Sequence, residues 1–313
     1  MTPEEAFAVL GEETRLEILR ALGDAEGPLS FSDLFDRVEY DDSSNFTYHL
    51  EKLVGHFVRK TDCGYELRQP GARVVEAVLS GVIDETPTIE PTRIDHECLL
   101  CGAPAVVHYR EDVVGLYCTE CDGMYGHPDP DDPTVPDELA DCGDLGGYPL
   151  PPSGLQGRTP TDAFEAAETW EMSQVLSWGS GVCPRCTAPM EREVRVCEDH
   201  DGTADRCSRC GRRYAVLVDG SCTNCPRKTT GLAAHYLLPN TEFLSFLTSN
   251  GVNPVSPMPE FYRVLIDHEE HVVSTDPLDV RLTFTVGDES ITFAVDEDLS
   301  ITDATRDRPS GGG

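Results

Sequence analysis

Apolar residues recur every three or four positions along residues 1–81, which is the spacing of amphipathic helices. The first apolar stripe predicts a packed helical pair and consists of Ala6, Val9, Leu10, Leu16, Ile18, Leu19 and Leu22. A further helix is expected after Ser30, which can cap its N-terminus and which precedes the buried face around Leu34.

A helix from about Ser43 to Gly55 has the clearest two-sided pattern. Its apolar positions fall on one narrow arc and are expected in the core: Phe46, Leu50 and Leu53. Its other faces are nearly free of acid and carry Ser44, Asn45, Tyr48 and Lys52. Short strands on both sides of residues 62–64 then predict a hairpin, and residues 72–79 predict a closing helix.

The middle of the chain is less regular. Residues 127–160 are crowded with Pro, Asp and Gly, so we expect an extended linker, largely without regular structure. Helices are predicted at residues 161–178 and 241–250, the second capped by Thr241 and closed by Gly251.

The C-terminal region alternates strictly between apolar and polar residues. From Val280 to Val295 this alternation brackets a turn, which predicts an antiparallel hairpin with one buried face. The last residues, 306–313, end in three glycines and are expected to be disordered.

Charge sets this chain apart from an ordinary globular protein. Asp and Glu number 57 against 24 Lys and Arg, which gives a formal net charge of −33 and a pI near 4.4. Because 39% of the residues are hydrophobic, we expect the acids on the surfaces of packed domains rather than in a disordered chain. With only three lysines (Lys52, Lys60 and Lys228), the composition resembles that of proteins from extremely halophilic archaea.

The sequence has no signature of export or membrane insertion. It begins without a basic region ahead of an apolar run, and no stretch approaches the roughly 18 apolar residues that a membrane span needs. We therefore expect a soluble, cytoplasmic protein.

Eleven of the thirteen cysteines occur in C-x-x-C or C-x-x-H units, the spacing of metal ligands rather than of a secreted disulfide scaffold. The first cluster joins Cys98 and Cys101 to Cys118 and Cys121 across sixteen residues rich in strand formers. A hairpin there would complete a zinc ribbon with four thiolates around one ion. The ion would supply folding free energy that so small a core cannot.

A second array holds four half-sites and predicts two further zinc ions. The half-sites are Cys183 with Cys186, Cys197 with His200, Cys207 with Cys210, and Cys222 with Cys225. We favour sequential pairing, in which the first two half-sites bind one ion and the last two bind the other, because each short gap holds a plausible hairpin. An interleaved cross-brace, first with third and second with fourth, stays open. Cys63 and Cys142 are left over and are expected to be free thiols.

The N-terminal region resembles the ArsR-like winged helix-turn-helix family. The resemblance rests on residues 10–19 (LGEETRLEIL) and 44–53 (SNFTYHLEKL) and covers about a quarter of the chain. It implies that the helix at 44–53 enters the major groove of double-stranded DNA, that the hairpin is the wing, and that the protein is a homodimer. The family's metal-sensing cysteines have no clear counterpart, since Cys63 stands alone in the wing.

The side chains expected to contact DNA come from that helix and from the wing. Ser44, Asn45, Thr47, Tyr48 and Lys52 can reach base edges, and Arg59 and Lys60 can reach phosphates. Residues 1–80 hold sixteen acids and eight bases, a net charge of −8, where an ordinary DNA-binding domain is basic. Near 1 M salt the Debye length is about 3 Å, so remote acids are screened and base contacts must carry the binding.

Beyond residue 93 the chain resembles the zinc-ribbon extension found behind winged helices in haloarchaeal regulators, through its paired knuckles and residues 148–155 (YPLPPSGL). We therefore expect an α+β multidomain protein. Its parts would be a winged helix at 1–81, a first zinc ribbon at 93–126, a linker at 127–160, a region at 161–305 and a disordered tail at 306–313. The region at 161–305 would hold a helix, the double zinc-knuckle array (183–225), a C-terminal helix and a β-hairpin.

The favoured hypothesis is a DNA-binding transcriptional regulator with three structural zinc ions, whose ribbons offer a surface to protein partners. The alternative is a zinc-ribbon adaptor for protein interactions without direct sequence-specific DNA binding. We do not expect an enzyme, because catalytic zinc keeps an open position whereas these sets of four ligands are closed, and no H-E-x-x-H occurs.

Overall fold

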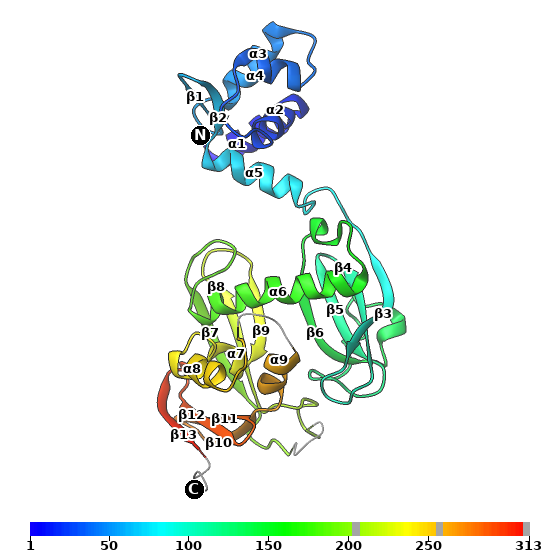
Figure 1. The fold of residues 1–313 in the computed structure, drawn as a ribbon, viewed down its shortest axis with the longest axis vertical. Coiled ribbons are helices and arrows are strands. Elements are labelled where there is room, and N and C mark those ends of the chain that lie inside the picture. The colour runs from blue at the N-terminus through cyan, green and yellow to red at the C-terminus, as the bar shows by residue number, and fades with distance from the viewer. Residues whose placement is uncertain (202–206, 255–258, 309–313) are drawn as a thin grey trace. The chain divides into compact units, whose positions relative to one another are not determined.

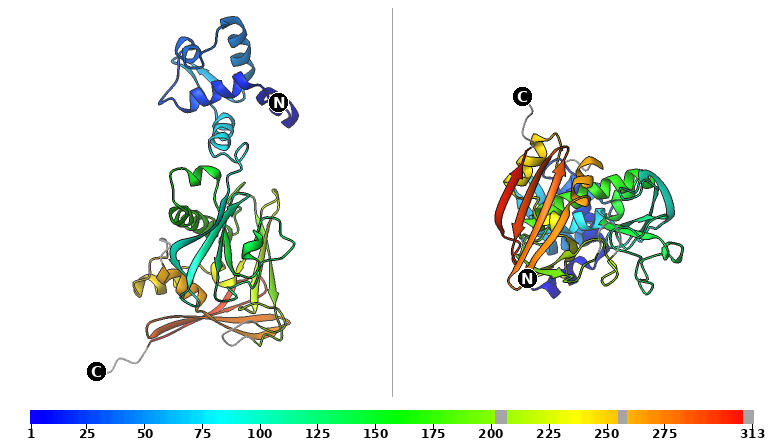
Figure 2. Two further views of the ribbon diagram at one scale, coloured as in Figure 1. Left: turned by 90° about the vertical axis from the view of Figure 1, so that its right-hand side faces the viewer. Right: turned by 90° about the horizontal axis from the view of Figure 1, so that it is seen from below.

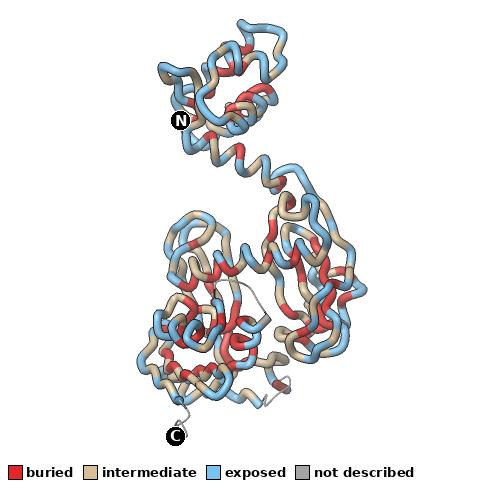
Figure 3. Tube along the Cα trace, in the orientation of Figure 1, coloured by how far each residue is buried: buried red, intermediate tan, exposed pale blue. Residues whose placement is uncertain are grey.

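The computed structural model describes residues 1–201, 207–254 and 259–308 and has the α+β class that the sequence predicts. The chain divides into two compact units (Figure 1). The N-terminal unit comprises Met1–Thr86 with Pro151–Ser153, and the second unit comprises Pro87–Leu150 with Gly154–Gly313. Buried residues form separate clusters in the two units (Figure 3).

The N-terminal unit packs helices around a two-stranded hairpin. Its elements are α1 (Pro3–Leu10), α2 (Glu13–Gly23), α3 (Phe31–Arg37), α4 (Ser43–Leu53), β1 (Val58–Thr61), β2 (Gly64–Leu67) and α5 (Gln69–Leu79). Ser30 caps α3 as expected, since its hydroxyl accepts a hydrogen bond from the backbone N–H of Asp33. The closing helix α5 starts at Gln69, three residues before the predicted Ala72, because Pro70 suits the first turn of a helix.

Helix α4 has the two faces that its sequence predicts. Asp42 caps it by accepting hydrogen bonds from the backbone N–H groups of Ser44 and Asn45. Its apolar arc is buried and consists of Phe46, Leu50 and Leu53, whereas Tyr48 is 50% exposed.

Two polar residues of the N-terminal unit are buried for structural reasons. The guanidinium of Arg15 donates a hydrogen bond of 2.7 Å to the carbonyl of Val9 and so satisfies the C-terminal end of α1. His49 on α4 lies with Nδ1 3.1 Å from a carboxylate oxygen of Glu12 at the start of α2. Arg15 and Glu12 belong to residues 10–19, and His49 belongs to residues 44–53, the two segments that carry the family resemblance. Some of the residues behind that resemblance therefore serve packing within the unit.

The described residues of the second unit form three antiparallel sheets. The first has the order β3-β4-β5-β6, the second β7-β8-β9 and the third β10-β11-β12-β13. In the third sheet the strands follow chain order, as the view from below shows (Figure 2). The strand bounds are β3 (Ile89–Glu97), β4 (Pro104–Arg110), β5 (Val113–Cys118), β6 (Gly143–Pro149), β7 (Met190–Val196), β8 (Val216–Cys222), β9 (Lys228–Leu232), β10 (Glu269–Thr275), β11 (Leu278–Val286), β12 (Glu289–Val295) and β13 (Ile301–Asp307).

Helix α6 (Pro160–Gly179) belongs to two of the hydrophobic clusters in this unit. Its first half buries Ala163, Phe164 and Ala167 against the β3–β6 sheet, and its second half, including Val175 and Trp178, packs into the larger cluster around β8, β11 and β12. Figure 1 shows α6 lying across both regions. Three shorter helices, α7 (Ala233–Tyr236), α8 (Thr241–Ser249) and α9 (Pro259–Ile266), complete the larger cluster.

The prediction of an extended linker at 127–160 is wrong for the part that forms a strand of the first sheet, residues 143–149. Residues 127–160 contain the 3-10 turns Asp137–Leu139 and Pro152–Leu155 and the strand β6, which pairs with β5 from Gly143↔Cys118 to Pro149↔Val113. The glycines that indicated a loop have another role. A Cβ at Gly143 would lie 2.1 Å from the carbonyl oxygen of Cys121, so glycine lets β6 pass directly against the second metal knuckle.

Two further predictions at the C-terminal end need correction. The N-cap of α8 is Asn240 rather than Thr241, because its side chain accepts hydrogen bonds from two backbone N–H groups. The hairpin from Val280 to Val295 is confirmed as β11 and β12, but it is the centre of a four-stranded sheet whose outer strands are β10 and β13.

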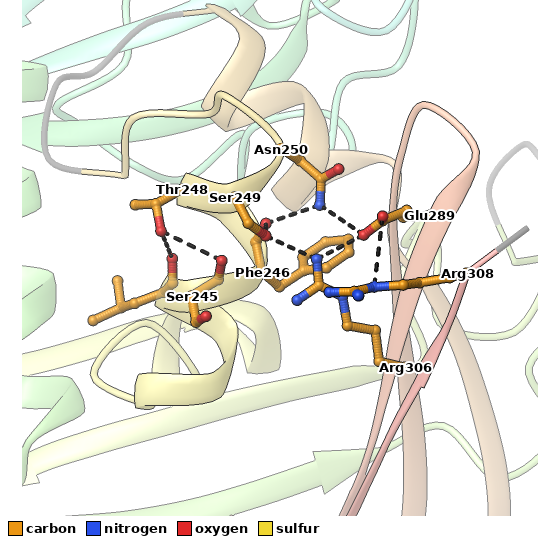
Figure 4. A network of polar contacts seen from close by, with 9 residues as sticks. Ser245, Phe246, Thr248, Ser249, Asn250, Glu289, Arg306 and Arg308 are labelled. Carbon is orange, nitrogen blue, oxygen red and sulfur yellow. Dashed lines mark hydrogen bonds and ion pairs between the residues drawn. The ribbon is translucent and has the colours of Figure 1, made fainter. Parts of the chain in front are cut away.

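The expected disorder from residue 306 is wrong for Arg306 and Asp307, and residues 309–313 lie outside the described part of the chain. Arg306 donates hydrogen bonds to Ser249 (2.8 Å) and Glu289 (2.6 Å), and its guanidinium lies over the ring of Phe246 (Figure 4). Arg308 lies 3.7 Å from the same carboxylate of Glu289, and these contacts lower the pKa of Glu289. The last strand is therefore fixed to the end of α8.

A buried carboxylate joins the third sheet to the second. Glu270 on β10 accepts hydrogen bonds from the backbone N–H groups of Ala215 (2.6 Å) and Val216 (3.1 Å), and its other oxygen lies 3.1 Å from Nε2 of His268. His268 Nδ1 contacts the carbonyl of Leu265 at 2.7 Å, so both ring nitrogens have partners.

We predict that Glu270→Ala lowers the free energy of unfolding of the second unit by about 3–5 kcal/mol, because it leaves His268 and two backbone N–H groups buried without their partner. Glu269→Ala changes the exposed neighbour on the same strand and should cost less than about 0.5 kcal/mol. Denaturant titration in molar salt measures both values. Equal losses in the two variants would contradict a structural role for Glu270.

Candidate functional site

The structure brings all twelve predicted metal ligands together in three groups of four. Within each group the ligand atoms all lie within 4.8 Å of one another. The three groups are Cys98, Cys101, Cys118 and Cys121; Cys183, Cys186, Cys222 and Cys225; and Cys197, His200, Cys207 and Cys210. We call them the ribbon site, the outer site and the inner site.

The ribbon site forms as the sequence predicts. Its first knuckle follows β3, and its second begins at Cys118, the last residue of β5. Since β4 and β5 form an antiparallel hairpin in which Ala105 pairs with Cys118, the two knuckles meet at one end of the sheet. Leu145 on β6 is buried with Cys98 and Cys118.

Both predicted pairings of the second array are wrong, because the half-sites are nested. The first pairs with the fourth to form the outer site, and the second pairs with the third to form the inner site. The cause is the pairing of β7 with β8, from Met190↔Cys222 to Val196↔Val216. Each strand runs between two half-sites, so the antiparallel ladder gathers one pair at each of its ends. Seven residues of strand separate the two sites by about 23 Å.

The distances fit tetrahedral coordination. The closest sulfur pairs lie 3.4 and 3.7 Å apart in the ribbon site, 3.4 and 3.7 Å apart in the outer site and 3.9 Å apart in the inner site. A tetrahedral ion with metal–sulfur bonds of about 2.3 Å separates neighbouring sulfurs by about 3.8 Å, whereas a disulfide joins them at about 2.05 Å. The spacing is that of ligands around an ion.

His200 is oriented as a ligand through Nδ1. Its Nε2 lies 3.0 Å from the carbonyl oxygen of Arg213, a contact in which the ring N–H donates. Nδ1 is then the nitrogen with a free lone pair, and it faces Cys210 Sγ at 3.6 Å. Metal-bound histidines commonly hold their second nitrogen in this way. The unusual C-x-x-H half-site is therefore completed by a backbone carbonyl that the sequence pattern does not reveal.

Four of the six half-sites share one backbone conformation. The first cysteine N–H donates to the carbonyl five residues later, as in Cys98 to Ala103 (2.7 Å) and Cys207 to Arg212 (2.9 Å), and the same bond occurs at 183 and 222. This tight loop needs a left-handed residue directly after the second cysteine in three of them: Gly102, Thr187 and Gly211. Thr187 has φ 62°, a conformation that costs a β-branched residue about 1 kcal/mol or more.

The backbone and the neighbouring thiols shift the pKa values of two outer-site cysteines in opposite directions. A hydrogen bond from the backbone of Ala188 lowers the pKa of Cys186 to about 6. The backbone of Arg227 lowers that of Cys225, but burial and the other thiols outweigh it and raise the pKa to about 12. Ionising several thiols so close together costs free energy, because the thiolates repel one another. A bound cation removes this repulsion.

The residues expected to contact DNA are exposed except for Thr47, which is half-buried. The Thr47 hydroxyl donates to the carbonyl of Ser43, and the amide of Asn45 donates to Tyr40. Lys52 lies over the ring of Tyr48 at 5.3 Å. Ser44 is exposed beside them on α4.

In the hairpin, Arg59 pairs with Glu66 at 2.7 Å and Lys60 lies over Tyr65 at 5.5 Å, so both bases have partners within their own unit. Cys63 is exposed at the tip of this hairpin. It and Cys142 lie outside the three ligand groups.

Two family models match the chain. One, a domain of unknown function (DUF7351), matches residues 95–301, and the other, a domain of unknown function (DUF7347), matches residues 3–78. No curated protein and no solved structure was found to match. Among the described residues, no helix is both long enough and apolar enough to cross a bilayer.

We predict three tightly bound metal ions per chain, and two in the variant Cys183→Ala/Cys222→Ala, whose substitutions both fall in the outer site. The control Cys183→Ala/Cys207→Ala damages the outer and inner sites together and should retain one ion. Elemental analysis after dialysis against a chelator counts the ions. Under sequential pairing both variants would weaken two sites and give the same count, which would overturn the nested arrangement.

Proposed function

The chain belongs to the family of the domain of unknown function DUF7351, and we propose that it is a DNA-binding transcriptional regulator with three structural zinc ions. In this proposal the N-terminal unit is an ArsR-like winged helix that binds double-stranded DNA as a homodimer. The second unit holds the zinc sites and offers a surface for protein partners. The protein would work in the salt-rich cytoplasm of an extreme halophile.

The two faces of α4 carry the proposal. Its buried residues fix the helix to α2 and α3, while Tyr48, Lys52 and their neighbours are exposed on its other faces. The order of three helices before α4 and a two-stranded hairpin followed by α5 after it is that of winged helices. In such domains the exposed helix reads base edges and the hairpin contacts the backbone.

The ligand sets support zinc as the ion. Four thiolates, or three thiolates with one imidazole, in tetrahedral geometry are typical of structural zinc. Each set is complete without a water molecule, so none offers the open position that a catalytic zinc needs. We therefore propose that the ions stabilise the fold and take part in no reaction.

High salt reconciles the acidic N-terminal unit with DNA binding. Its bases are few and partly neutralised, since Arg59 pairs with Glu66. Tyr48 offers instead a half-exposed aromatic ring, and the ammonium group of Lys52 lies 5.3 Å from the centre of that ring. Apolar and hydrogen-bonding contacts of the ring keep their strength in molar salt, where charge attraction is screened and the release of counterions gives little affinity.

We predict that Tyr48→Ala weakens binding to selected DNA at least about tenfold while changing the free energy of unfolding by less than about 0.5 kcal/mol, because the ring is half exposed. The DNA is selected from a random library with the wild-type protein in 2 M KCl. Trp170→Ala is the control, since it truncates an aromatic side chain of similar exposure, 45%, in the second unit. If no DNA is selected, the adaptor function replaces DNA binding. If both variants bind the selected DNA as wild type does, α4 does not read the DNA through Tyr48.

A second prediction concerns salt. Between about 0.5 and 3 M KCl, the logarithm of affinity should fall with the logarithm of salt at a slope shallower than the roughly −5 to −9 expected for about 6 to 10 phosphate contacts. The reason is the scarcity of free bases near α4 and the hairpin. Fluorescence anisotropy of labelled DNA measures this slope. A steep slope would show that phosphate contacts dominate.

A further inference from the structure

The second unit contains a cavity of about 1210 Å³ beside α6. Its walls come from α6, from the end of β3 with the first knuckle of the ribbon site, from β6 and from α7 and α9. The volume exceeds that of a metal ion or a few waters and is ample for an organic molecule.

Carboxyl groups dominate the charge of the cavity wall. Of the described residues that line it, six are acidic and one is an arginine, Arg263. The histidine His235 adds no charge at neutral pH, because burial lowers its pKa to about 4. The other histidine, His96, lies 3.1 Å from the carboxylate of Glu165.

Two of these acids differ from the surface acids that a halophilic composition explains. Glu168 and Glu171 lie one turn apart on α6, half-buried. Burial raises the pKa of Glu168 to about 8 and that of Glu171 to about 7. Within the described chain, the Glu168 carboxyl group has no hydrogen bond or ion pair. The Glu171 carboxyl group has a 3.3 Å contact with Gln174, and the charges of Arg227 and Arg185 lower its pKa against the larger effect of burial. Burying a carboxyl group without a partner lowers the free energy of unfolding, and a ligand that pairs with the group would offset this loss.

Aromatic rings line the same cavity as the two carboxyl groups. The cavity is lined by Tyr125, Tyr148 and Tyr262. After burial, the charges of Glu168 and Glu171 raise the pKa of Tyr262 further, and both act on Tyr148 as well, so these hydroxyls lie near the carboxyl groups. Rings and carboxylates together form the kind of surface that binds ammonium and other organic cations.

We propose that this cavity binds an organic cation with an apolar body, its charge held by Glu168 and Glu171 and its body packed against the tyrosine rings. An anion is disfavoured by the six carboxyl groups, and a bare metal ion by the size of the cavity and its apolar walls. The proposal does not depend on DNA binding, so its test is independent of the one for α4.

Tetraphenylphosphonium is a suitable probe, because tetraphenylborate has the same shape and the opposite charge. Titration calorimetry with the full chain is done at pH 8.5, above the pKa of both carboxyl groups, and in 3 M NaCl, which screens the surface acids. We expect saturable binding of one cation per chain and at least about tenfold weaker binding of the borate. Equal binding of the two probes, or no saturable binding of the cation, would overturn the proposal without reference to any variant.

The double variant Glu168→Gln/Glu171→Gln should weaken binding of the cation at least about tenfold. It should fold, because neither half-buried carboxyl group forms an ion pair with a described residue and glutamine keeps the size and polarity of the side chain. Glu193→Gln, which neutralises an exposed acid on β7, is the matched control and should bind as wild type. Tyr262→Leu keeps the apolar volume without the ring and should weaken binding at least about threefold. Unchanged affinity of the double variant for the cation would mean that the cation binds at another site, and this would overturn the proposal.

Discussion

The pairing of β7 with β8 is the constraint on which most of the second unit depends. One antiparallel register places a metal site at each end of the ladder, and the same strands support β9 and the inner face of the larger cluster. A shift of one residue would turn every side chain of β7 to the opposite face and separate both sets of ligands. Metal binding and strand register therefore specify each other. Only one register brings four ligands together at each end of the ladder, and that register assembles both sites.

The acidic composition has two different physical consequences in this protein. Most of the acids are exposed, where solvent and salt screen them at little cost. A few are inside. Glu270 is stabilised there by backbone N–H groups and by His268, whereas Glu168 lacks any such partner among the described residues. Composition alone cannot separate these classes, because the difference lies in what each carboxylate touches.

Local signals in the sequence predicted local structure well. The buried arc of Phe46, Leu50 and Leu53 follows from helical spacing, and each metal half-site follows from two ligands three residues apart. The nested pairing could not be read in this way, since it depends on which strands pair across the whole array. The one signal in the sequence that fits it is the near-equal gap of ten residues after Cys186 and eleven after Cys210, which suits two strands of one ladder. Strand β6 was missed because its glycines, needed for close approach to the second knuckle, have the composition of a loop. The cavity acids on α6 were indistinguishable from the other acids of a chain with 57 of them.

Helix α6 is 20 residues long, about 30 Å, and is shared by two clusters of buried side chains. Neither cluster is complete without it, so the two parts of the second unit share one structural element. Glu168 and Glu171 lie near the middle of this helix, between the parts that belong to the two clusters. A molecule bound there would therefore contact the one helix that both clusters share.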